Sequence, residues 1–212
     1  GPEHSSARIE RFLTLSARGN LRLAQPSTAA QYFHLLRSQV RLAVPRPLVV
    51  LTPKSLLRAR VARSPLPDFE RGCFVEVLDD PAADEEGFDR AAVRRVVLCS
   101  GKIAYEAMAR RDRLGPEAAG IVVVRVEQLY PWPRDTIGAV LDRYAAADEV
   151  VWLQEEPENM GAWNFVHGRL HRLLRESHSL RHVSRAESAS PATGSAALHR
   201  LEQEDLLARA VG

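Results

Sequence analysis

Two adjacent carboxylates, Glu155 and Glu156, stand directly after the apolar run of residues 150–153. The run has the length and β-branched content of a buried strand, so the strand is predicted to end here and to carry the pair to its carboxyl edge. Pro157 is expected to stop the strand, and residues from Ala162 onward have helical spacing. Ligands of open α/β sheets bind at this edge. Such a pair is nevertheless more often a helix-dipole partner or an interface ion pair than a catalytic pair, so spacing alone predicts no enzyme.

His4 precedes a predicted helix start at residues 5–6, a setting that suits proton transfer or anion binding. The alternative is a solvent-exposed histidine near a chain end. His167 and His171 have the i, i+4 spacing of a metal pair, but the sequence offers no glutamate in an HExxH arrangement and no obvious third ligand. The histidines other than His4 are interpreted as helix-surface or loop residues: His34, His167, His171, His178, His182 and His199.

Two further segments have residue types that bind anions. Residues 100–102, Ser-Gly-Lys, open a predicted helix after a strand but lack the spacing of a P-loop, so a simple strand-to-helix turn is favoured. Residues 184–194 offer hydroxyls and Arg185 before the last predicted helix, where a packed loop is slightly favoured over an anion site. The sequence contains no GxGxxG, no GxSxG and no GDG followed by an asparagine about thirty residues later.

Composition restricts the class of protein. The 212 residues are 45% apolar, enough for one large or two small globular domains. The net charge is only +2, and Arg dominates the cations, because Lys54 and Lys102 are the only lysines; this argues against nucleic-acid binding. No apolar run reaches the roughly 18 residues of a membrane helix, and the first residues do not resemble a signal peptide. Cys73 and Cys99 are expected to be buried free thiols in a reducing cytoplasm.

Strands and helices are predicted to alternate along most of the chain. The expected strands are residues 21–24, 48–51, 73–78, 93–99, 121–126, 150–153 and 180–183. The expected helices run from residue 5 to about 19, from 29 to 42, from 101 to about 113, from 133 to about 144, from 162 onward and from 194 to about 210. The pattern predicts an α/β fold with a mostly parallel sheet and helices on both faces. Residues 1–53 are interpreted as the end of one domain, 54–68 as a linker and 69–212 as a second domain.

Several motifs resemble one family, the C-terminal part of the E1 component of 2-oxoglutarate dehydrogenase, including the multifunctional 2-oxoglutarate decarboxylase forms. The resemblance runs essentially from end to end of the chain. It rests on GPEHSSARIERFL at residues 1–13, PSTAAQYFHLLR at 26–37, RPLVVLTPKSLLR at 46–58, SGK at 100–102, RVEQLY at 125–130, QEEPENMGAW at 154–163 and SASPATG at 188–194.

The resemblance implies a transketolase-type enzyme that depends on thiamine diphosphate and Mg²⁺. Residues 1–53 would then be the end of the pyrimidine-binding domain, and residues 69–212 the transketolase C-terminal-like domain. The family decarboxylates 2-oxoglutarate in the tricarboxylic acid cycle and passes the succinyl group to the lipoamide of the E2 component. The segments that bind thiamine diphosphate and Mg²⁺ are expected to lie outside this chain. A homodimer partner is implied as well, with the Glu155–Glu156 pair in a structural loop near the interface.

Two residues receive roles through the resemblance. His4 matches the histidine of the substrate pocket, where it would donate hydrogen bonds to the oxoglutarate carboxylate or to a developing oxyanion. Gln128 matches a region that binds acetyl-CoA or a nucleotide effector in some bacterial members. Relatives commonly carry arginine at the position of Ser38, and some are more basic at Asp135 and Thr136, which lowers the expected affinity for phosphate groups.

The leading hypothesis is therefore the C-terminal part of a 2-oxoglutarate dehydrogenase E1 that is inactive without the rest of the enzyme. A decarboxylase or carboligase is the alternative chemistry for the parent enzyme. A hypothesis from another class is a non-catalytic α/β module that binds an effector or dimerises. The orphan β-α-β unit before residue 53 favours the fragment, because a self-contained module would not begin in the middle of a domain.

Overall fold

The computed structural model describes residues 7–212, so His4 and the predicted cap at residues 5–6 lie outside the described residues. The helices and strands, in chain order, are α1 (Ile9–Leu15), β1 (Arg22–Ala24), α2 (Ala29–Val40), β2 (Leu48–Val50), η2 (Lys54–Arg58), η3 (Arg60–Ala62), α3 (Leu66–Arg71), β3 (Val77–Leu78), η4 (Pro81–Asp84), η5 (Arg90–Ala92), β4 (Arg95–Cys99), α4 (Ile103–Leu114), η6 (Gly115–Ala118), β5 (Ile121–Val126), β6 (Gln128–Tyr130), α5 (Arg134–Arg143), β7 (Glu149–Pro157), α6 (Trp163–His171), β8 (Ser179–Arg185) and α7 (Ala196–Val211).

The larger sheet has five strands in the order β3-β5-β4-β7-β8. All neighbouring pairs are parallel except β3 with β5. Val97 in the central strand β4 stands opposite Val123 on one side and Val151 on the other. The predicted mostly parallel sheet is confirmed, and its strands are apolar throughout because both faces are covered.

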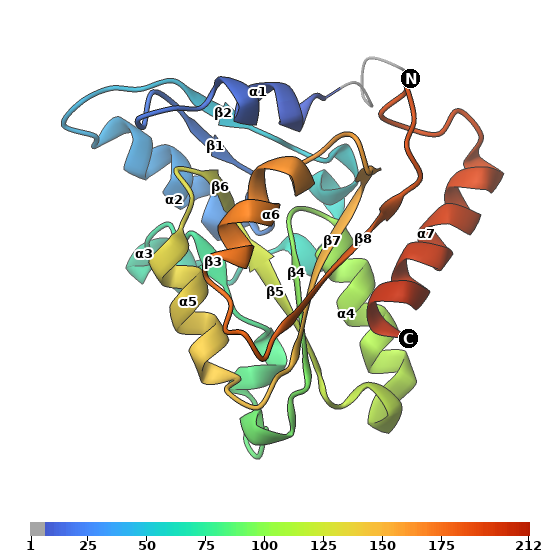
Figure 1. Cartoon of the computed structure of the whole chain (residues 1–212). Helices are drawn as coiled ribbons and strands as arrows, with labels where there is room; N and C mark the ends of the chain where they lie inside the picture. Colours follow the sequence, from blue (N-terminus) through green and yellow to red (C-terminus); the bar gives the residue numbers. More distant parts are fainter. Residues whose placement is uncertain (1–6) are drawn as a thin grey trace.

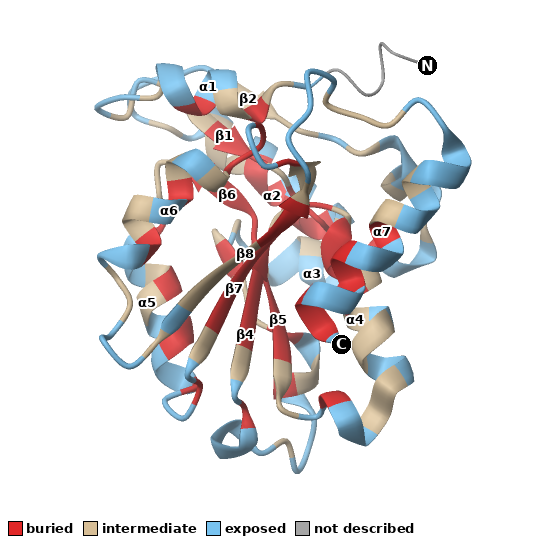
Figure 2. Ribbon diagram, turned by 45° about the vertical axis from the view of Figure 1, so that its right-hand side comes forward, coloured by how far each residue is buried: buried red, intermediate tan, exposed pale blue. Residues whose placement is uncertain are grey.

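Helices cover both faces of this sheet, with α5 and α6 on one side and α4 and α7 on the other (Figure 1). Successive side chains of a strand point to opposite faces, so each strand supplies two cores. Leu98 and Trp152 pack with α5 and α6, whereas Val97 and Leu153 pack with α4 and α7. Figure 2 shows the buried residues concentrated along the central strands and the inner sides of these helices.

The smaller sheet has three strands in the order β2-β1-β6. β1 is parallel to β2, as the predicted β-α-β unit requires, and Thr28 caps α2 by accepting a hydrogen bond from the Gln31 N–H. The third strand, β6, was not predicted. It comes from the part of the chain that also builds the larger sheet and pairs with β1 in antiparallel fashion. The N-terminal unit is therefore joined to the rest by strand pairing.

Two predicted element ends were wrong. α1 ends at Leu15 and not near residue 19, because the Asn20 side chain donates to the Leu15 carbonyl and closes the turn that follows. β7 does not stop at Leu153. It continues through both glutamates to Pro157, which stands opposite Arg185 after a register shift. Proline is tolerated there because the irregular pairing does not need its missing N–H.

Burial also differs from the expectation at three places. Cys99 is a buried free thiol as predicted, but Cys73 is exposed, because β3 is limited to Val77–Leu78 and leaves Cys73 in a loop. His34 was placed on a helix surface, yet it is only 2% exposed and its Nε2 lies 2.7 Å from the Asp68 carbonyl oxygen. Only Ala30 and Leu35 of the apolar residues of α2 are buried, whereas its large apolar side chains Tyr32, Phe33, Leu36 and Val40 are exposed.

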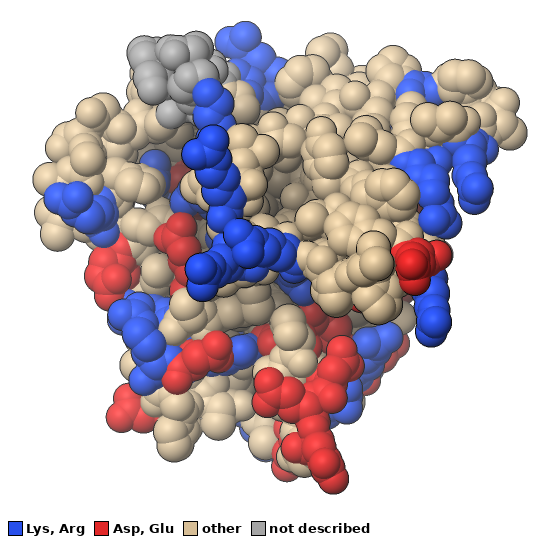
Figure 3. Space-filling view, turned by 180° about the vertical axis from the view of Figure 1, so that it is seen from behind, with Lys and Arg blue, Asp and Glu red and all other residues tan. Residues whose placement is uncertain are grey.

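Charges of both signs are spread over the surface. On the face opposite to that of Figure 1, acidic and basic side chains intermix over the lower half, whereas a band of Lys and Arg runs down through the otherwise mostly uncharged upper half to the middle (Figure 3). Among residues 7–212, no helix has both the length and the apolar character needed to cross a membrane.

One buried ion pair anchors the loop between β3 and β4. Asp80 is fully buried and pairs with Arg111 of α4. Its carboxylate also accepts hydrogen bonds from the Ala82 N–H at 3.0 Å and from the Val123 N–H at 2.6 Å. The second acidic partner of Arg111 is Asp112, whose side chain is 65% exposed. Water can therefore take the place of the Asp112 carboxylate, but it cannot reach the buried position of the Asp80 carboxylate.

We predict that Asp80→Ala lowers the free energy of unfolding by about 3 kcal/mol or more, because it leaves a partly buried guanidinium and a buried N–H without a partner. Asp112→Ala, which removes the exposed partner of the same arginine, should cost less than about 1 kcal/mol. Urea denaturation of both variants measures the difference. Equal losses would contradict the assignment of Asp80 as the anchor.

Candidate functional site

Gln128 opens β6 at the junction of the two sheets and is only 3% exposed. Its side-chain oxygen accepts a hydrogen bond from Arg22 Nη2 at 3.2 Å. Its side-chain nitrogen donates to Glu76 Oε1 at 3.1 Å and to the Pro131 carbonyl at 3.0 Å. The amide is therefore fully occupied by protein groups, and Gln128 holds Arg22 and Glu76 in place.

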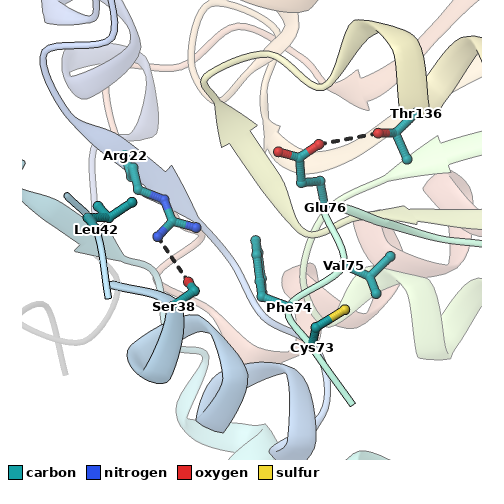
Figure 4. Close-up of a pocket in the computed structure, with 8 residues that line it drawn as sticks. All are labelled: Arg22, Ser38, Leu42, Cys73, Phe74, Val75, Glu76 and Thr136. Atoms are coloured by element: carbon teal, nitrogen blue, oxygen red, sulfur yellow. Dashed lines mark hydrogen bonds between the residues drawn. The ribbon is translucent and has the colours of Figure 1, made fainter. Parts of the chain in front are cut away.

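A cleft of about 450 Å³ lies beside this contact, and Figure 4 shows the residues that line it. Arg22 and Glu76 reach into it from opposite sides, with Phe74 between them. Arg22 donates to Ser38 Oγ at 3.1 Å, and Thr136 donates to Glu76 Oε2 at 3.2 Å. The lining residues are Arg22, Ser38, Leu42, Cys73, Phe74, Val75, Glu76 and Thr136.

The electrostatics of this cleft are balanced. Burial lowers the pKa of Arg22 and the nearby Glu76 carboxylate raises it, but an arginine remains charged at any physiological pH. One cation therefore faces one anion, with the hydroxyls of Ser38 and Thr136 at the edges. Such a lining can bind a phosphate or carboxylate through Arg22, but Glu76 opposes a ligand of high negative charge.

A second polar cluster lies at the carboxyl end of β5. Glu127 is 1% exposed, and its carboxylate accepts hydrogen bonds from the Ser27 N–H at 2.8 Å and the Ser27 hydroxyl at 2.5 Å. Arg125 donates to the same hydroxyl at 3.2 Å, and the Tyr105 hydroxyl donates to the Ser27 carbonyl at 2.7 Å. Burial raises the pKa of Glu127 to about 7, although the Ser27 bonds and Arg125 act in the opposite direction.

The glutamate pair at the end of β7 does not act as a unit. Glu155 forms an ion pair with Lys102, which also binds Glu106 at 2.9 Å. Gln203 of α7 donates to both of these glutamates. The lysine of the Ser-Gly-Lys turn is thus neutralised by protein carboxylates and does not face a free anion site. Burial, and then the charge of Glu155, raises the pKa of Glu156 to about 7.

The histidines do not form a metal centre in the described part of the chain, where no group of three or more His, Cys, Asp or Glu could hold an ion. The rings of His167 and His171 are 6.4 Å apart. His182 lies in β8, not in a loop, and stacks on Trp163 with ring centroids 4.1 Å apart. Burial, helped by the positive charge of Arg209, lowers the pKa of His182 to about 4, so it is neutral at neutral pH.

Comparison with known proteins decides the family. A family model described as 2-oxoglutarate dehydrogenase C-terminal matches residues 63–211. The chain belongs to this 2-oxoglutarate dehydrogenase family. A second model, the transketolase pyrimidine binding domain, matches residues 1–60. The two matches cover successive parts of the chain and meet between residues 60 and 63.

Curated relatives agree with this family assignment along the whole chain. The 2-oxoglutarate dehydrogenase E1 component of Rickettsia typhi is 43% identical over 216 residues, which cover 100% of this chain and 22% of the relative. The E1 component of Cupriavidus necator is 46% identical, and the match covers 98% of this chain and 21% of the relative. The multifunctional 2-oxoglutarate metabolism enzyme of Mycolicibacterium vanbaalenii is 42% identical, and the match covers 100% of this chain and 17% of the relative. The chain spans about a fifth of the length of these relatives.

Among solved structures, a split gene transketolase described as an inactive beta4 tetramer superposes with a TM-score of 0.62. The two sequences are 16% identical, and the superposition covers 96% of this chain and 61% of the transketolase chain. At this identity the likeness establishes the fold, which is the transketolase-like α/β architecture that the sequence predicts.

The sequence did not predict most of the residues that build the Arg22 cleft and the polar cluster around Glu127. Arg22 and Glu76 flank a cleft that forms only when β1 and β3 are brought together by β6. Glu127 stands directly after the predicted strand of residues 121–126, and this position is its one signal in the sequence. Its partner Ser27 lies too far away in the chain for spacing to reveal the contact.

We predict that Glu127 makes the stability of this 2-oxoglutarate dehydrogenase family chain depend on pH. Its folded pKa of about 7 lies above the ordinary value of 4.5, so the folded state binds more protons than the unfolded state between these values. The free energy of unfolding should therefore fall as pH rises from 4.5 through about 7, by up to about 1.4 kcal/mol for each pKa unit. Urea denaturation across this range measures the slope.

The matched variant is Glu127→Gln, whose amide still accepts the Ser27 N–H but does not titrate. It should show a smaller decline in stability over the same pH range. Glu117→Gln, at an exposed glutamate, should retain the decline of the unmodified chain. Identical slopes for Glu127→Gln and the unmodified chain would show that Glu127 is not the titrating group.

Proposed function

We propose that the chain is the C-terminal part of a thiamine-diphosphate-dependent 2-oxoglutarate dehydrogenase E1. The parent enzyme decarboxylates 2-oxoglutarate oxidatively and transfers the succinyl group to the lipoamide of an E2 partner. The observation that carries the proposal is the 2-oxoglutarate dehydrogenase C-terminal match over residues 63–211, with E1 relatives 43–46% identical along the whole chain. We also propose a homodimer of the parent enzyme, on the basis of the family resemblance.

A second chemistry is favoured by one specific comparison. The multifunctional 2-oxoglutarate metabolism enzyme of Mycolicibacterium vanbaalenii is nearly as similar to this chain, at 42% identity. A parent that acts as decarboxylase or carboligase therefore remains the alternative. The two outcomes differ in the acceptor that reaches the active site, which is determined by parts of the parent outside this chain.

We propose the division of the chain into the end of a pyrimidine-binding domain at residues 1–53, a linker at 54–68 and a transketolase C-terminal-like domain at 69–212. The matches to residues 1–60 and 63–211 support a boundary in this region. The short 3-10 helices η2 and η3 occupy the proposed linker and carry the chain between the two units.

The described residues do not fit thiamine diphosphate or its Mg²⁺. A carboxylate that activates the pyrimidine ring must face a cavity, but both oxygens of the buried Glu127 are bonded to Ser27. No described group of acidic residues could hold the metal. We therefore propose that segments of the parent other than the described residues 7–212 bind the cofactor.

His4 is the one residue proposed to touch the substrate. As a hydrogen-bond donor it would bind a carboxylate of 2-oxoglutarate or stabilise negative charge that develops on oxygen in the transition state. The proposal rests on the family resemblance of residues 1–13, because His4 lies outside the described residues. A donor of this kind typically contributes about 10²-fold or more to turnover.

We predict that His4→Ala in the full-length parent lowers turnover by about 10²-fold without unfolding the protein. The measurement is 2-oxoglutarate-dependent reduction of ferricyanide in the presence of thiamine diphosphate and magnesium. His171→Ala, at an exposed histidine of α6, is the matched control and should retain full turnover. Unchanged turnover in His4→Ala would remove His4 from the mechanism, and no activity in the unmodified parent would favour a non-catalytic effector-binding or dimerising module.

We further propose that the Arg22 cleft is an effector site for acetyl-CoA or a nucleotide, in which Gln128 is a positioning residue. Gln128 is too buried to bind the effector, but it fixes the guanidinium that would meet a phosphate. Ser38 and Thr136 line the cleft, and Asp135 directly precedes Thr136 in the first turn of α5. Affinity is expected to be weak, because the family resemblance implies arginine in many relatives at the position of Ser38 and more basic residues in some relatives at Asp135 and Thr136.

We predict that Ser38→Arg tightens binding of acetyl-CoA or AMP to the chain about tenfold, because it adds a second guanidinium beside Arg22. Arg22→Met should weaken binding about tenfold or abolish it, whereas Arg175→Met, at an exposed arginine paired with Asp142, should not change it. Isothermal titration calorimetry measures each dissociation constant. Failure of both the unmodified chain and Ser38→Arg to bind would exclude an effector site in this cleft.

A further inference from the structure

A second cavity lies at the N-terminal end of α2, and we call it the Tyr32 cavity. Its volume is about 670 Å³, which is within the range of small-molecule sites. One side comes from residues 26–32, where the chain leaves β1 and enters α2, and the other side comes from residues 52–63, which follow β2. The Tyr32 cavity shares no lining residue with the Arg22 cleft, so the two are separate sites.

The walls of the Tyr32 cavity are mainly apolar. Ala29, Leu56 and Ala62 belong to the lining, and Ala62 is buried. Two larger side chains of the lining remain open to solvent, since Tyr32 is 40% exposed and Leu57 is 78% exposed. An apolar group that entered the cavity would remove part of this surface from water, which is favourable.

The charge of the Tyr32 cavity is entirely positive. Arg58 and Arg63 are its charged lining residues, and no carboxylate within residues 7–212 forms an ion pair with either of them. The surrounding sequence explains this, because residues 11–67 contain ten Lys or Arg and no Asp or Glu. Residues 68–212, in contrast, contain 18 Lys or Arg and 25 Asp or Glu. The Arg22 cleft differs in the same respect, since Glu76 opposes its arginine.

Two hydroxyl groups of the lining are already used by the protein. Ser27 Oγ donates to Glu127 Oε1 at 2.5 Å and accepts a hydrogen bond from Arg125 at 3.2 Å. Thr28 Oγ1 accepts a hydrogen bond from the Gln31 N–H at 3.2 Å. A negatively charged group in the cavity would therefore be bound by the two guanidinium groups rather than at the end formed by residues 27–28.

We propose that the Tyr32 cavity binds a small organic carboxylate, whose apolar body packs against Tyr32 and Leu57 and whose carboxylate pairs with Arg58 and Arg63. A guanidinium group binds a carboxylate through two parallel N–H donors, and this geometry favours arginine over lysine at such a site. The apolar walls exclude water beside the pair and so strengthen the attraction. The site does not depend on the proposed roles of His4 and of the Arg22 cleft.

The first test measures binding of 4-phenylbutyrate to the chain from the shifts of its backbone amide NMR signals. A dissociation constant of about 1 mM is expected for a probe of this size, with the shifts concentrated in residues 26–32 and 52–63. Two matched probes each lack one feature, since 4-phenylbutanol has no charge and butyrate has no ring. Both should bind about tenfold more weakly or not at all. Equal binding of 4-phenylbutanol, or shifts located elsewhere in the chain, would overturn the proposal.

Variants of the lining test the charged and apolar contacts separately. The double variant Arg58→Met and Arg63→Met should weaken binding of 4-phenylbutyrate about tenfold or more, because both guanidinium groups are lost. Arg60→Met is the matched control, at an exposed arginine of the same segment that does not line the cavity, and should bind normally. An equal loss in Arg60→Met would show attraction by the net charge and no specific site.

Tyr32→Ser should weaken binding of 4-phenylbutyrate about fivefold, because the ligand loses an apolar contact. Val40→Ser, at a residue of α2 that is 86% exposed and lies outside the cavity, is the control and should not change binding. Since Tyr32 and Val40 are both exposed, the two variants are expected to fold, and unchanged amide signals of the five-stranded sheet verify this. Unchanged affinity in a folded Tyr32→Ser variant would overturn the apolar contact.

The same probe distinguishes a ligand site from a surface that another segment of the parent covers. Saturation-transfer NMR should detect binding of 4-phenylbutyrate to the full-length parent, and the double variant Arg58→Met and Arg63→Met should abolish that signal. Binding to the chain without binding to the parent would show that the parent fills the Tyr32 cavity with its own residues, and this would overturn the proposal.

Discussion

At Glu127 the chain leaves the five-stranded sheet and enters the three-stranded sheet, and this residue is bonded to both. Its N–H donates to the Glu76 carbonyl at 2.9 Å, and its own carbonyl accepts the Gln25 N–H at 2.8 Å. Its carboxylate accepts two hydrogen bonds from Ser27. Because a buried carboxylate is costly unless it is bonded, Ser27 has to lie at this point, and the N-terminal unit is held against the carboxyl edge of the larger sheet. Gln128, which organises the Arg22 cleft, follows directly and donates its own N–H to the same Glu76 carbonyl at 3.1 Å.

The larger sheet could be predicted from the sequence because its strands are continuous apolar runs bounded by polar residues. Residues 121–126 were predicted to form a strand, and β5 has these bounds. The errors occur where distant contacts decide the structure. β6 has only three residues, and its pairing with β1 has no local signal. β7 passes its predicted end because β8 offers a partner beyond the register shift. His34 is buried because its ring meets the Asp68 carbonyl of α3, which no helical pattern within α2 reveals.

The candidate sites were less predictable than the fold, for a related reason. Glu155 was interpreted as a helix-dipole partner or an interface ion pair in a loop, but it lies in β7 and pairs with Lys102 of the same chain, a residue that was interpreted separately. Gln128 was found only through the family resemblance, and its amide turns out to be used entirely within the protein. The cleft beside it needs a cation from β1 and a carboxylate from the residue before β3. A site of this kind is a property of the assembled sheets and is not encoded in any one segment.

The pairing of β6 with β1 connects the N-terminal unit to the larger unit in addition to the backbone between them. The N-terminal sheet receives its third strand from a segment more than seventy residues further along the chain than its second strand. A break of the backbone in the short helical turns at residues 54–62 would therefore not release two independent folds. One piece would carry an unfilled strand position beside β1 and the other an unpaired strand, so each would hold the complementary edge of the other. The two units are therefore joined by strand pairing between β1 and β6 in addition to their covalent connection.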